Sequence, residues 1–179
     1  MVYVFLADGF EETEAIAPID ILRRSGVTVK TVGVGAKKIT SSHKITVEAD
    51  LTEDELTTDG LEAVVLPGGM PGTLNLEASK TVQSYIDYAD ANDILLCAIC
   101  AAPSVFGHKE LLKGKKATCY PGFEKDLVGA QVTDLPAVAD GNFITGKGAG
   151  AAIEFGLLIS ETLCGAETAN KVRESMQCP

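Results

Sequence analysis

Residues 94–103 read ILLCAICAAP, an apolar run of strand length followed by two alanines and a proline. Proline suits the first turn of a helix because its missing N–H would have no partner there. Cys100 is therefore predicted to lie at a sharp turn between a strand and a helix, at the carboxyl end of the strand. This is the topology of a nucleophile elbow, in which small neighbours leave space for a sharply turned backbone.

On both sides of this segment, apolar runs of strand length alternate with helical patterns along the chain. Strands are expected at residues 3–6, 28–33, 63–66, 94–99 and 143–145, with shorter ones at 117–120, 132–133 and 137–138. Helices are expected at 14–25, 80–89, 103–112, 149–163 and 166–175. The turn at residues 140–142 predicts a hairpin between the last two strands. The alternation predicts an α/β fold with a mostly parallel sheet and helices on both faces.

Length and composition favour one globular domain. The chain has 179 residues, and 46% of them are hydrophobic, which excludes disordered and collagen-like classes. It carries 15 basic and 25 acidic residues, and its formal net charge is −10. Basic residues do not gather next to aromatic ones, so nucleic acid and anionic membranes are not expected as partners.

The beginning of the chain predicts a strand rather than a targeting segment. Residues 1–7 are apolar, but no positive charge precedes them and Asp8 follows at once. No run approaches the roughly 18 apolar residues that a membrane span requires. We expect a protein that neither enters nor crosses a membrane.

The cysteines and histidines favour a reducing compartment and no metal. The five cysteines are an odd number, which fits free thiols and a cytoplasmic location. Cys97 and Cys100 fall within one strand-like run, where they cannot both turn to one metal. His43 lies in a polar stretch and His108 lies along the helix after Cys100, so neither is expected as a partner base. Neither a metal nor a cofactor is predicted.

Cys100 is the candidate nucleophile. Free backbone amides and the helix dipole at such a turn favour an anion, so the thiol pKa is expected to be lowered. The alternative is that Cys100 is a buried small hydrophobe, as most cysteines are. Its position favours the functional interpretation, because ligands of open α/β sheets bind at the carboxyl ends of the strands. Cys97, in the middle of the strand, is predicted to belong to the core.

A second segment is expected at the same edge of the sheet. The strand at 63–66 is followed by PGGMPG, residues 67–72. Glycine amides can approach a ligand closely, so Gly68 and Gly69 are candidate substrate-binding residues, and the amides of Gly69 and Ala101 are candidate oxyanion donors. The alternative is an ordinary glycine turn. The segment lacks the spacing and the lysine of a phosphate loop, so nucleotide binding is not indicated.

A third segment, ADGFEETEAIAP at residues 7–18, places several acidic residues where a strand passes into a helix. Their usual explanation is favourable charge at a helix N-terminus. Pro18 cannot bond the carbonyl of Glu14, so the helix is expected to begin near Glu14 or to kink there. Glu14 is the acidic residue expected to turn inward. A carboxyl in an apolar pocket has a raised pKa and, when protonated, can donate a hydrogen bond to a thiolate.

These motifs, together with TGKGAGAAIEFG at residues 145–156, resemble the ThiJ/PfpI superfamily and most closely its DJ-one branch. The resemblance spans nearly the whole chain. It implies a flavodoxin-like three-layer sandwich, a single class I glutamine amidotransferase-like domain over residues 1–179, and a homodimer. It also implies that Cys100 is the nucleophile, that Glu14 is a protonated glutamate in contact with it, and that Gly69 and Ala101 supply the oxyanion donors.

The sequence departs from the family pattern in two places. Protease-type members carry a histidine directly after the cysteine, and here that residue is Ala101, which speaks against a peptidase. Much of the DJ-one branch has a histidine before a nearby proline, and here Tyr120 takes that position. Tyrosine is a poor base near neutral pH, given its usual pKa of about 10, so Tyr120 is expected to orient substrate. Cys119 is expected to be buried, or to form a disulfide with oxidised Cys100.

The resemblance implies a cofactor-independent glyoxalase or deglycase acting on 2-oxoaldehydes such as methylglyoxal, or on their early glycation adducts. The alternatives are an oxidative-stress sensor or redox-regulated chaperone that uses Cys100 oxidation, and a protease or amidase, for which no base partner is present. The apolar residues of the first helix fit either a dimer interface or simple core packing. They are Ile16, Ile19, Ile21 and Leu22.

Overall fold

Buried apolar strands form a seven-stranded sheet in the computed structural model, which describes residues 1–178. The strand order is β10-β11-β7-β6-β1-β2-β5, and every pair is parallel except β10 and β11. The strands are β1 (Val2–Leu6), β2 (Val29–Gly33), β5 (Leu51–Thr52), β6 (Ala63–Leu66), β7 (Leu95–Ile99), β10 (Ala137–Asp140) and β11 (Phe143–Gly146). β1, β6, β7 and β11 are buried along their whole length, as expected for parallel strands covered on both faces.

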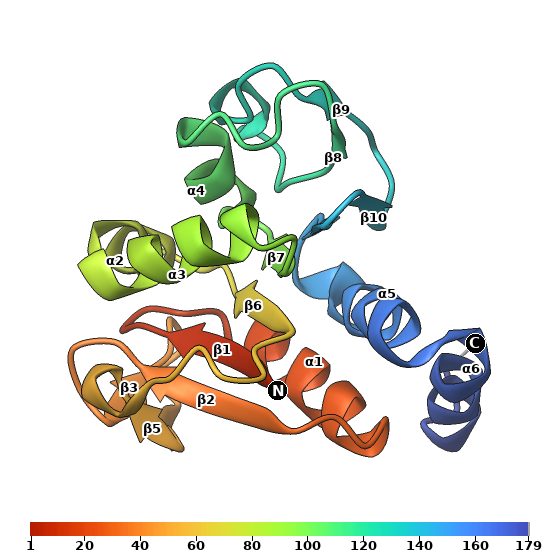
Figure 1. Ribbon diagram of the computed structural model, residues 1–179, viewed down its shortest axis with the longest axis horizontal. Coiled ribbons are helices and arrows are strands. Elements are labelled where there is room, and N and C mark those ends of the chain that lie inside the picture. Colours follow the sequence, from red (N-terminus) through yellow and green to blue (C-terminus); the bar gives the residue numbers. More distant parts are fainter. Residues whose placement is uncertain (179) are drawn as a thin grey trace.

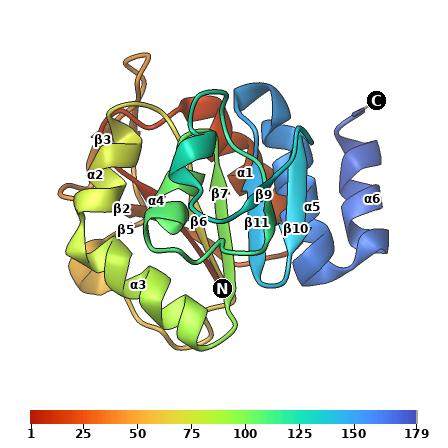
Figure 2. The same cartoon turned by 90° about the horizontal axis from the view of Figure 1, so that it is seen from above.

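Helices cover both faces of the sheet, as the alternating pattern predicts (Figures 1 and 2). One face packs against α1 (Glu12–Arg24) and α5 (Ala152–Cys164). The other packs against α2 (Gly72–Ala78), α3 (Lys80–Ala91) and α4 (Pro103–His108). α6 (Ala166–Ser175) lies outside α5, where Val172 packs with Leu157 and Ile21. The flavodoxin-like three-layer fold is confirmed.

Side chains of β7 alternate between the two layers because successive residues of a strand point to opposite faces. Leu96 and Ala98 pack on the side of α3 and α4, whereas Cys97 and Ile99 pack on the side of α1 and α5. Cys97 is fully buried, which confirms its predicted place in the core. Cys100 follows on from this strand and reaches the end of the sheet.

Several short elements are not predicted from the sequence. β3 (Lys38–Thr40) and β4 (Thr46–Glu48) form a hairpin with mostly exposed or half-buried residues, so they lack an apolar alternation. α2 follows a glycine-rich loop. β8 (Lys116–Ala117) pairs with β9 (Gln131–Val132) in a separate small sheet. The strand expected at 117–120 is therefore confined to its first residue, and Cys119 and Tyr120 lie in the loop that follows.

Among the helices whose bounds differ from the prediction, α4 and α1 show a physical reason for the difference. α4 ends at His108 instead of residue 112, and Glu110 adopts a left-handed φ of 57°. This turn directs Leu112 into the core, where it is fully buried, so the leucine that suggested more helix serves tertiary packing. α1 begins at Glu12 and continues through Pro18, which lies inside the helix. The proline removes one backbone bond without ending the helix.

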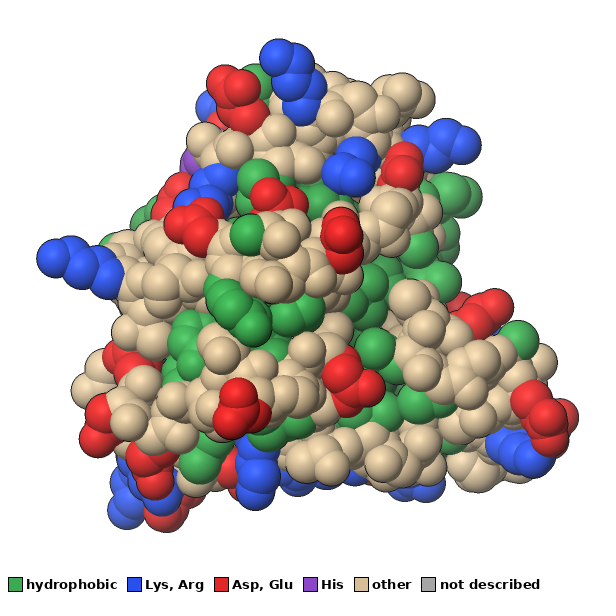
Figure 3. All heavy atoms as spheres, viewed as in Figure 1, with side chains coloured by type: hydrophobic (Ala, Val, Ile, Leu, Met, Phe, Trp, Pro, Cys, Tyr) green, Lys and Arg blue, Asp and Glu red, His purple; other side chains and the backbone are tan. Residues whose placement is uncertain are grey.

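The surface mixes charges of both signs. On the face shown in Figure 3, acidic side chains (red) lie among basic ones (blue), with hydrophobic side chains (green) between them. Within residues 1–178, no helix has both the length and the apolar character needed to cross a membrane.

Candidate active site

The backbone at Cys100 forms the elbow that the sequence predicts. Cys100 has a φ of 66°, a left-handed conformation that side chains other than glycine rarely adopt. Two hydrogen bonds hold it in place. Its N–H donates to the carbonyl of Gly146 at 2.9 Å, and its carbonyl accepts from the N–H of Tyr120 at 2.8 Å. Backbone strain of this kind persists only where surrounding structure enforces it, and it clusters at functional sites.

Two backbone amides reach the Cys100 side chain. One belongs to Ala101 and the other to Gly69, in the loop after β6. Both hydrogen bonds lower the pKa of the thiol because they stabilise negative charge on sulfur. The structure thus brings together the two amides that the sequence analysis proposes as oxyanion donors, at the edge of the sheet where they are expected.

Glu14 projects from the first turn of α1 toward the same point. Its side chain is 1% exposed, and Oε2 accepts a hydrogen bond from the N–H of Gly68 at 2.9 Å. The N-cap residue Glu11 accepts from the Glu14 N–H at 2.7 Å, while its own N–H donates to the Gly68 carbonyl at 2.9 Å. The first turn of α1 and the glycine loop are therefore tied together, and the Gly68 amide is engaged in holding Glu14.

The Glu14 carboxyl and the Cys100 thiol form a side-chain hydrogen bond. Oε1 of Glu14 is buried and has no hydrogen-bond partner of standard geometry in the described part of the chain. Gly68 lies beside both groups. A Cβ at this position would come within 2.6 Å of the Cys100 Cβ and 2.6 Å of Glu14 Oε2, so only glycine leaves room for the pair.

Burial dominates the electrostatics of this pair. It raises the pKa of Glu14 to about 7, and the nearby charge of Glu11 acts in the same direction. Burial and the negative charge of Glu14 also raise the pKa of Cys100 to about 12, against the effect of the two amides. The expectation of a lowered thiol pKa is therefore wrong while Glu14 is ionised. A thiolate requires Glu14 to keep its proton, and the two groups titrate as a coupled unit.

The remaining candidate residues lie around this centre. Tyr120 is 51% exposed beyond the elbow, and Cys119 is buried with a free thiol. The histidines are engaged elsewhere, His43 with Glu12 at 3.0 Å and His108 with Glu77 at 2.6 Å.

Two residues that support the site were not predicted from the sequence. Gly146 gives no sequence signal for its bond to Cys100, because that contact depends on strand pairing. Glu11 could have been found, because an acidic residue three positions before Glu14 has the spacing of an N-cap.

One group of side chains in the described residues has the proximity of metal ligands. Donor atoms of Glu11, Glu12 and His43 lie within 4.8 Å of one another. These groups already serve other contacts, since Glu11 caps α1 and Glu12 pairs with His43. The absence of a metal stays a prediction.

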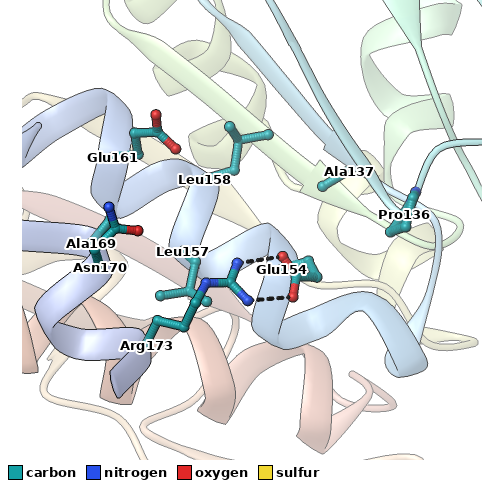
Figure 4. Close-up of a pocket in the computed structure, with 9 residues that line it drawn as sticks. All are labelled: Pro136, Ala137, Glu154, Leu157, Leu158, Glu161, Ala169, Asn170 and Arg173. Carbon is teal, nitrogen blue, oxygen red and sulfur yellow. Dashed lines mark hydrogen bonds and ion pairs between the residues drawn. The ribbon is translucent and has the colours of Figure 1, made fainter. Parts of the chain in front are cut away.

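Two hollows lie on either side of Pro136. One, of about 460 Å³, is lined by Tyr120, Lys147 and the Gly148 to Ala151 turn. The other, of about 260 Å³, lies between α5 and α6 (Figure 4). There Arg173 donates two hydrogen bonds to Glu154 at 3.0 and 2.7 Å, which pairs these two charges, and Glu161 also lines the hollow. The first hollow is connected to the site through Tyr120, whose N–H donates to the Cys100 carbonyl, whereas the lining of the second has no such connection.

Comparison with known proteins decides the family. A family model described as DJ-1/PfpI matches residues 1–162. This chain belongs to the DJ-1/PfpI family. It is 36% identical to protein dj-1beta of Drosophila melanogaster over 97% of this chain and 94% of that protein. It is 30% identical to a protein named deglycase from Pyrococcus abyssi, over 82% of this chain and 89% of that one.

A solved structure shows the same fold. The crystal structure of a cysteine-to-alanine variant of a DJ-1 superfamily protein from Salmonella typhimurium has a TM-score of 0.93 and 38% identity. The match covers 99% of this chain and 98% of that one. The resemblance inferred from the motifs is therefore confirmed at the level of family and fold.

The glycine loop of this DJ-1/PfpI protein yields a stability prediction. A Cβ at Gly69, where φ is 90°, would lie 2.4 Å from the Glu11 nitrogen, whereas a Cβ at Gly26, with a similar φ of 82°, meets nothing within 4 Å. Both alanine variants acquire the same left-handed strain. We expect Gly69→Ala to lose about 2 kcal/mol more than Gly26→Ala in urea unfolding, from the steric clash alone. Equal losses of unfolding free energy in the two variants would show that the loop can shift to relieve the clash at almost no cost.

Proposed function

We propose that this DJ-1/PfpI protein is a cofactor-independent enzyme that converts 2-oxoaldehydes such as methylglyoxal, or their early glycation adducts, through a covalent intermediate on Cys100. The observation that carries the proposal is the buried carboxyl of Glu14 against the sulfur, with the Gly69 and Ala101 amides directed at the same point. A nucleophile, a proton carrier and two oxyanion donors are what such a reaction requires.

The reaction begins with the tautomer in which sulfur is ionised and Glu14 is protonated. The thiolate adds to the aldehyde carbon, and the resulting alkoxide takes the proton of Glu14 to give a hemithioacetal. The Glu14 carboxylate then removes the proton from that carbon and delivers it to the neighbouring ketone carbon, through an enediolate stabilised by the two amides. The product of this transfer is a thioester, and water hydrolyses it to a 2-hydroxy acid and regenerates the thiol.

The net reaction consumes one oxoaldehyde and one water and needs no oxidant or reductant. A protein free of added cofactors should therefore form lactate from methylglyoxal. In heavy water, lactate formed by transfer through Glu14 should retain part of the original hydrogen at the carbon that bears the hydroxyl, detectable by proton NMR. Failure to form lactate at any pH between 5 and 9 would contradict the proposal.

An oxidative-stress sensor is the second candidate function, and one observation favours it. Cys100 is partly exposed, as are Cys164 and Cys178, whereas Cys97 and Cys119 are buried, so peroxide can reach the Cys100 sulfur. Mass spectrometry after mild peroxide treatment, run beside the methylglyoxal assay, separates the two functions. Selective oxidation of Cys100 with negligible turnover would favour sensing or a redox-regulated chaperone.

We also propose a homodimer in the cytoplasm, with residues 1–179 acting as one domain. Ile19, Ile21 and Leu22 of α1 are core residues, whereas Ile16 is 46% exposed. Ile153 on the adjacent helix α5 is 40% exposed. These two isoleucines are candidate interface residues. Sedimentation analysis of the wild type and of Ile16→Glu tests the proposal, with dissociation to monomer expected for the variant.

A further inference from the structure

We propose that the pocket lined by Tyr120 and the Gly148 to Ala151 turn binds the substituent of the oxoaldehyde, so that an aryl-substituted substrate is preferred to methylglyoxal. This inference rests on the proposed function and extends it to a substrate class. It concerns the hollow of about 460 Å³ beside the elbow.

Backbone hydrogen bonds place this pocket next to Cys100. The Tyr120 N–H donates to the Cys100 carbonyl at 2.8 Å, and the Gly146 carbonyl accepts from the Cys100 N–H at 2.9 Å. Gly148 is two residues beyond Gly146, which limits its backbone to about 7 Å from that contact. The pocket therefore begins within reach of a substituent attached to an aldehyde that is bound at sulfur.

The lining favours a flat apolar group. The Tyr120 ring forms one wall and lies against Gly148, where a Cβ would approach within 3.3 Å of the ring. Prolines and alanines supply half of the remaining lining residues: Pro121, Pro136, Ala149 and Ala151. The charged side chains of the lining, Lys147 and Asp134, form an ion pair with each other. Aromatic groups pack well against tyrosine and proline faces, whereas a pocket with its charges already paired gains little from a charged substituent.

The size of the pocket also exceeds what methylglyoxal requires. Pockets for drug-sized ligands span roughly 300–1,000 Å³, and this one falls within that range. The methyl group of methylglyoxal would leave most of it filled with water. A phenyl ring would displace that water and bury apolar surface, which lowers the free energy of the bound state.

The test compares phenylglyoxal with methylglyoxal, using the products mandelate and lactate as readouts. We expect the wild type to have a kcat/KM at least about tenfold higher for phenylglyoxal, mainly through KM, because one buried group in an apolar pocket commonly contributes that factor. Gly150 lines the pocket, and a Cβ there meets nothing within 4 Å. Gly150→Leu should fill the space and lower the ratio of the two kcat/KM values at least about tenfold. Ala91→Leu, which adds the same side chain at the exposed end of α3, should leave the ratio unchanged.

The outcomes separate this inference from the proposed function. If the wild type forms neither product, the proposed function fails. If lactate forms but phenylglyoxal has an equal or lower kcat/KM, or if Gly150→Leu leaves the ratio unchanged, the pocket inference is overturned. Should Gly150→Leu fail to fold by circular dichroism, Tyr120→Ala serves as the second variant, because it removes the aromatic wall and should lower the same ratio.

Discussion

Replacing Cys100 by alanine is expected to lower kcat/KM for methylglyoxal by about 10⁴-fold or more, because the covalent route has no other nucleophile. Alanine has the same backbone preferences as cysteine, so the elbow at a φ of 66° and its bonds to Gly146 and Tyr120 should persist. The loss would then report the missing sulfur alone. Lactate formation measured with wild-type and variant protein at equal concentration provides the comparison.

Cys164→Ala is the matched control for this variant. Cys164 is the last residue of α5, and its thiol is free and half-buried, so the substitution removes a comparable sulfur away from the elbow. We expect wild-type turnover. A Cys100→Ala variant that retained full turnover would end the proposal that Cys100 is the nucleophile of a glyoxalase.

The second large effect concerns Glu14→Gln, which should make the protein more stable and less active. The Glu14 carboxyl has a pKa of about 7 in the folded protein, against 4.5 for an exposed glutamate. Between pH 4.5 and pH 7 the folded state therefore binds the Glu14 proton more tightly than the unfolded state does. The stabilising contribution of the buried, protonated carboxyl is fully present below pH 4.5 and is lost as pH rises through 7.

The size of this effect follows from the shift in pKa. The free energy of unfolding of the wild type should fall by about 3 kcal/mol relative to Glu14→Gln between pH 4.5 and pH 8. Glutamine keeps the acceptor oxygen for the Gly68 N–H and has no proton to lose. Urea unfolding of both proteins at several pH values measures the difference, and subtraction removes the contributions of all other titrating groups. Parallel curves would show that Glu14 titrates as an exposed residue.

Turnover should change in the opposite direction. Glutamine cannot carry a proton between carbons, so kcat for methylglyoxal should fall by about 10²- to 10⁴-fold, in the range typical of lost general acid–base catalysis. A variant that is more stable at pH 8 yet inactive would show that the buried carboxyl is retained for chemistry at the expense of stability. Unchanged turnover with the predicted gain in stability would instead make Glu14 a structural residue.

Much of this arrangement could be predicted from the chain alone, because it depends on local rules. An apolar run followed by small residues and a proline predicts the elbow at Cys100, and the alternation of strand and helix patterns predicts the covered parallel sheet. In such a sheet the carboxyl ends of the strands meet, which brings Gly69 and Ala101 to one edge. The inward turn of Glu14 follows from its apolar neighbours.

Elements that depend on distant packing could not be predicted in this way. α4 ends early because Leu112 is required in the core, and the exposed residues of β3 and β4 carry no apolar alternation. The sequence pattern at Cys119 and Tyr120 predicts a strand, but both residues lie in a loop. The Tyr120 N–H of this loop donates a hydrogen bond to the carbonyl of Cys100. In each case a contact from another part of the chain outweighs the local preference.

Local sequence patterns are enough to predict which residues meet at the edge of the sheet, whereas the charge states of these residues follow from the way the whole fold packs around them. Local reasoning assigned Cys100 a low pKa from the amides and the helix dipole. The folded chain places the partly buried sulfur against the Glu14 carboxyl, where burial and the neighbouring charges raise both pKa values. Desolvation and charge–charge repulsion depend on everything packed around a group, so they follow from the complete fold and not from the residues adjacent in the chain.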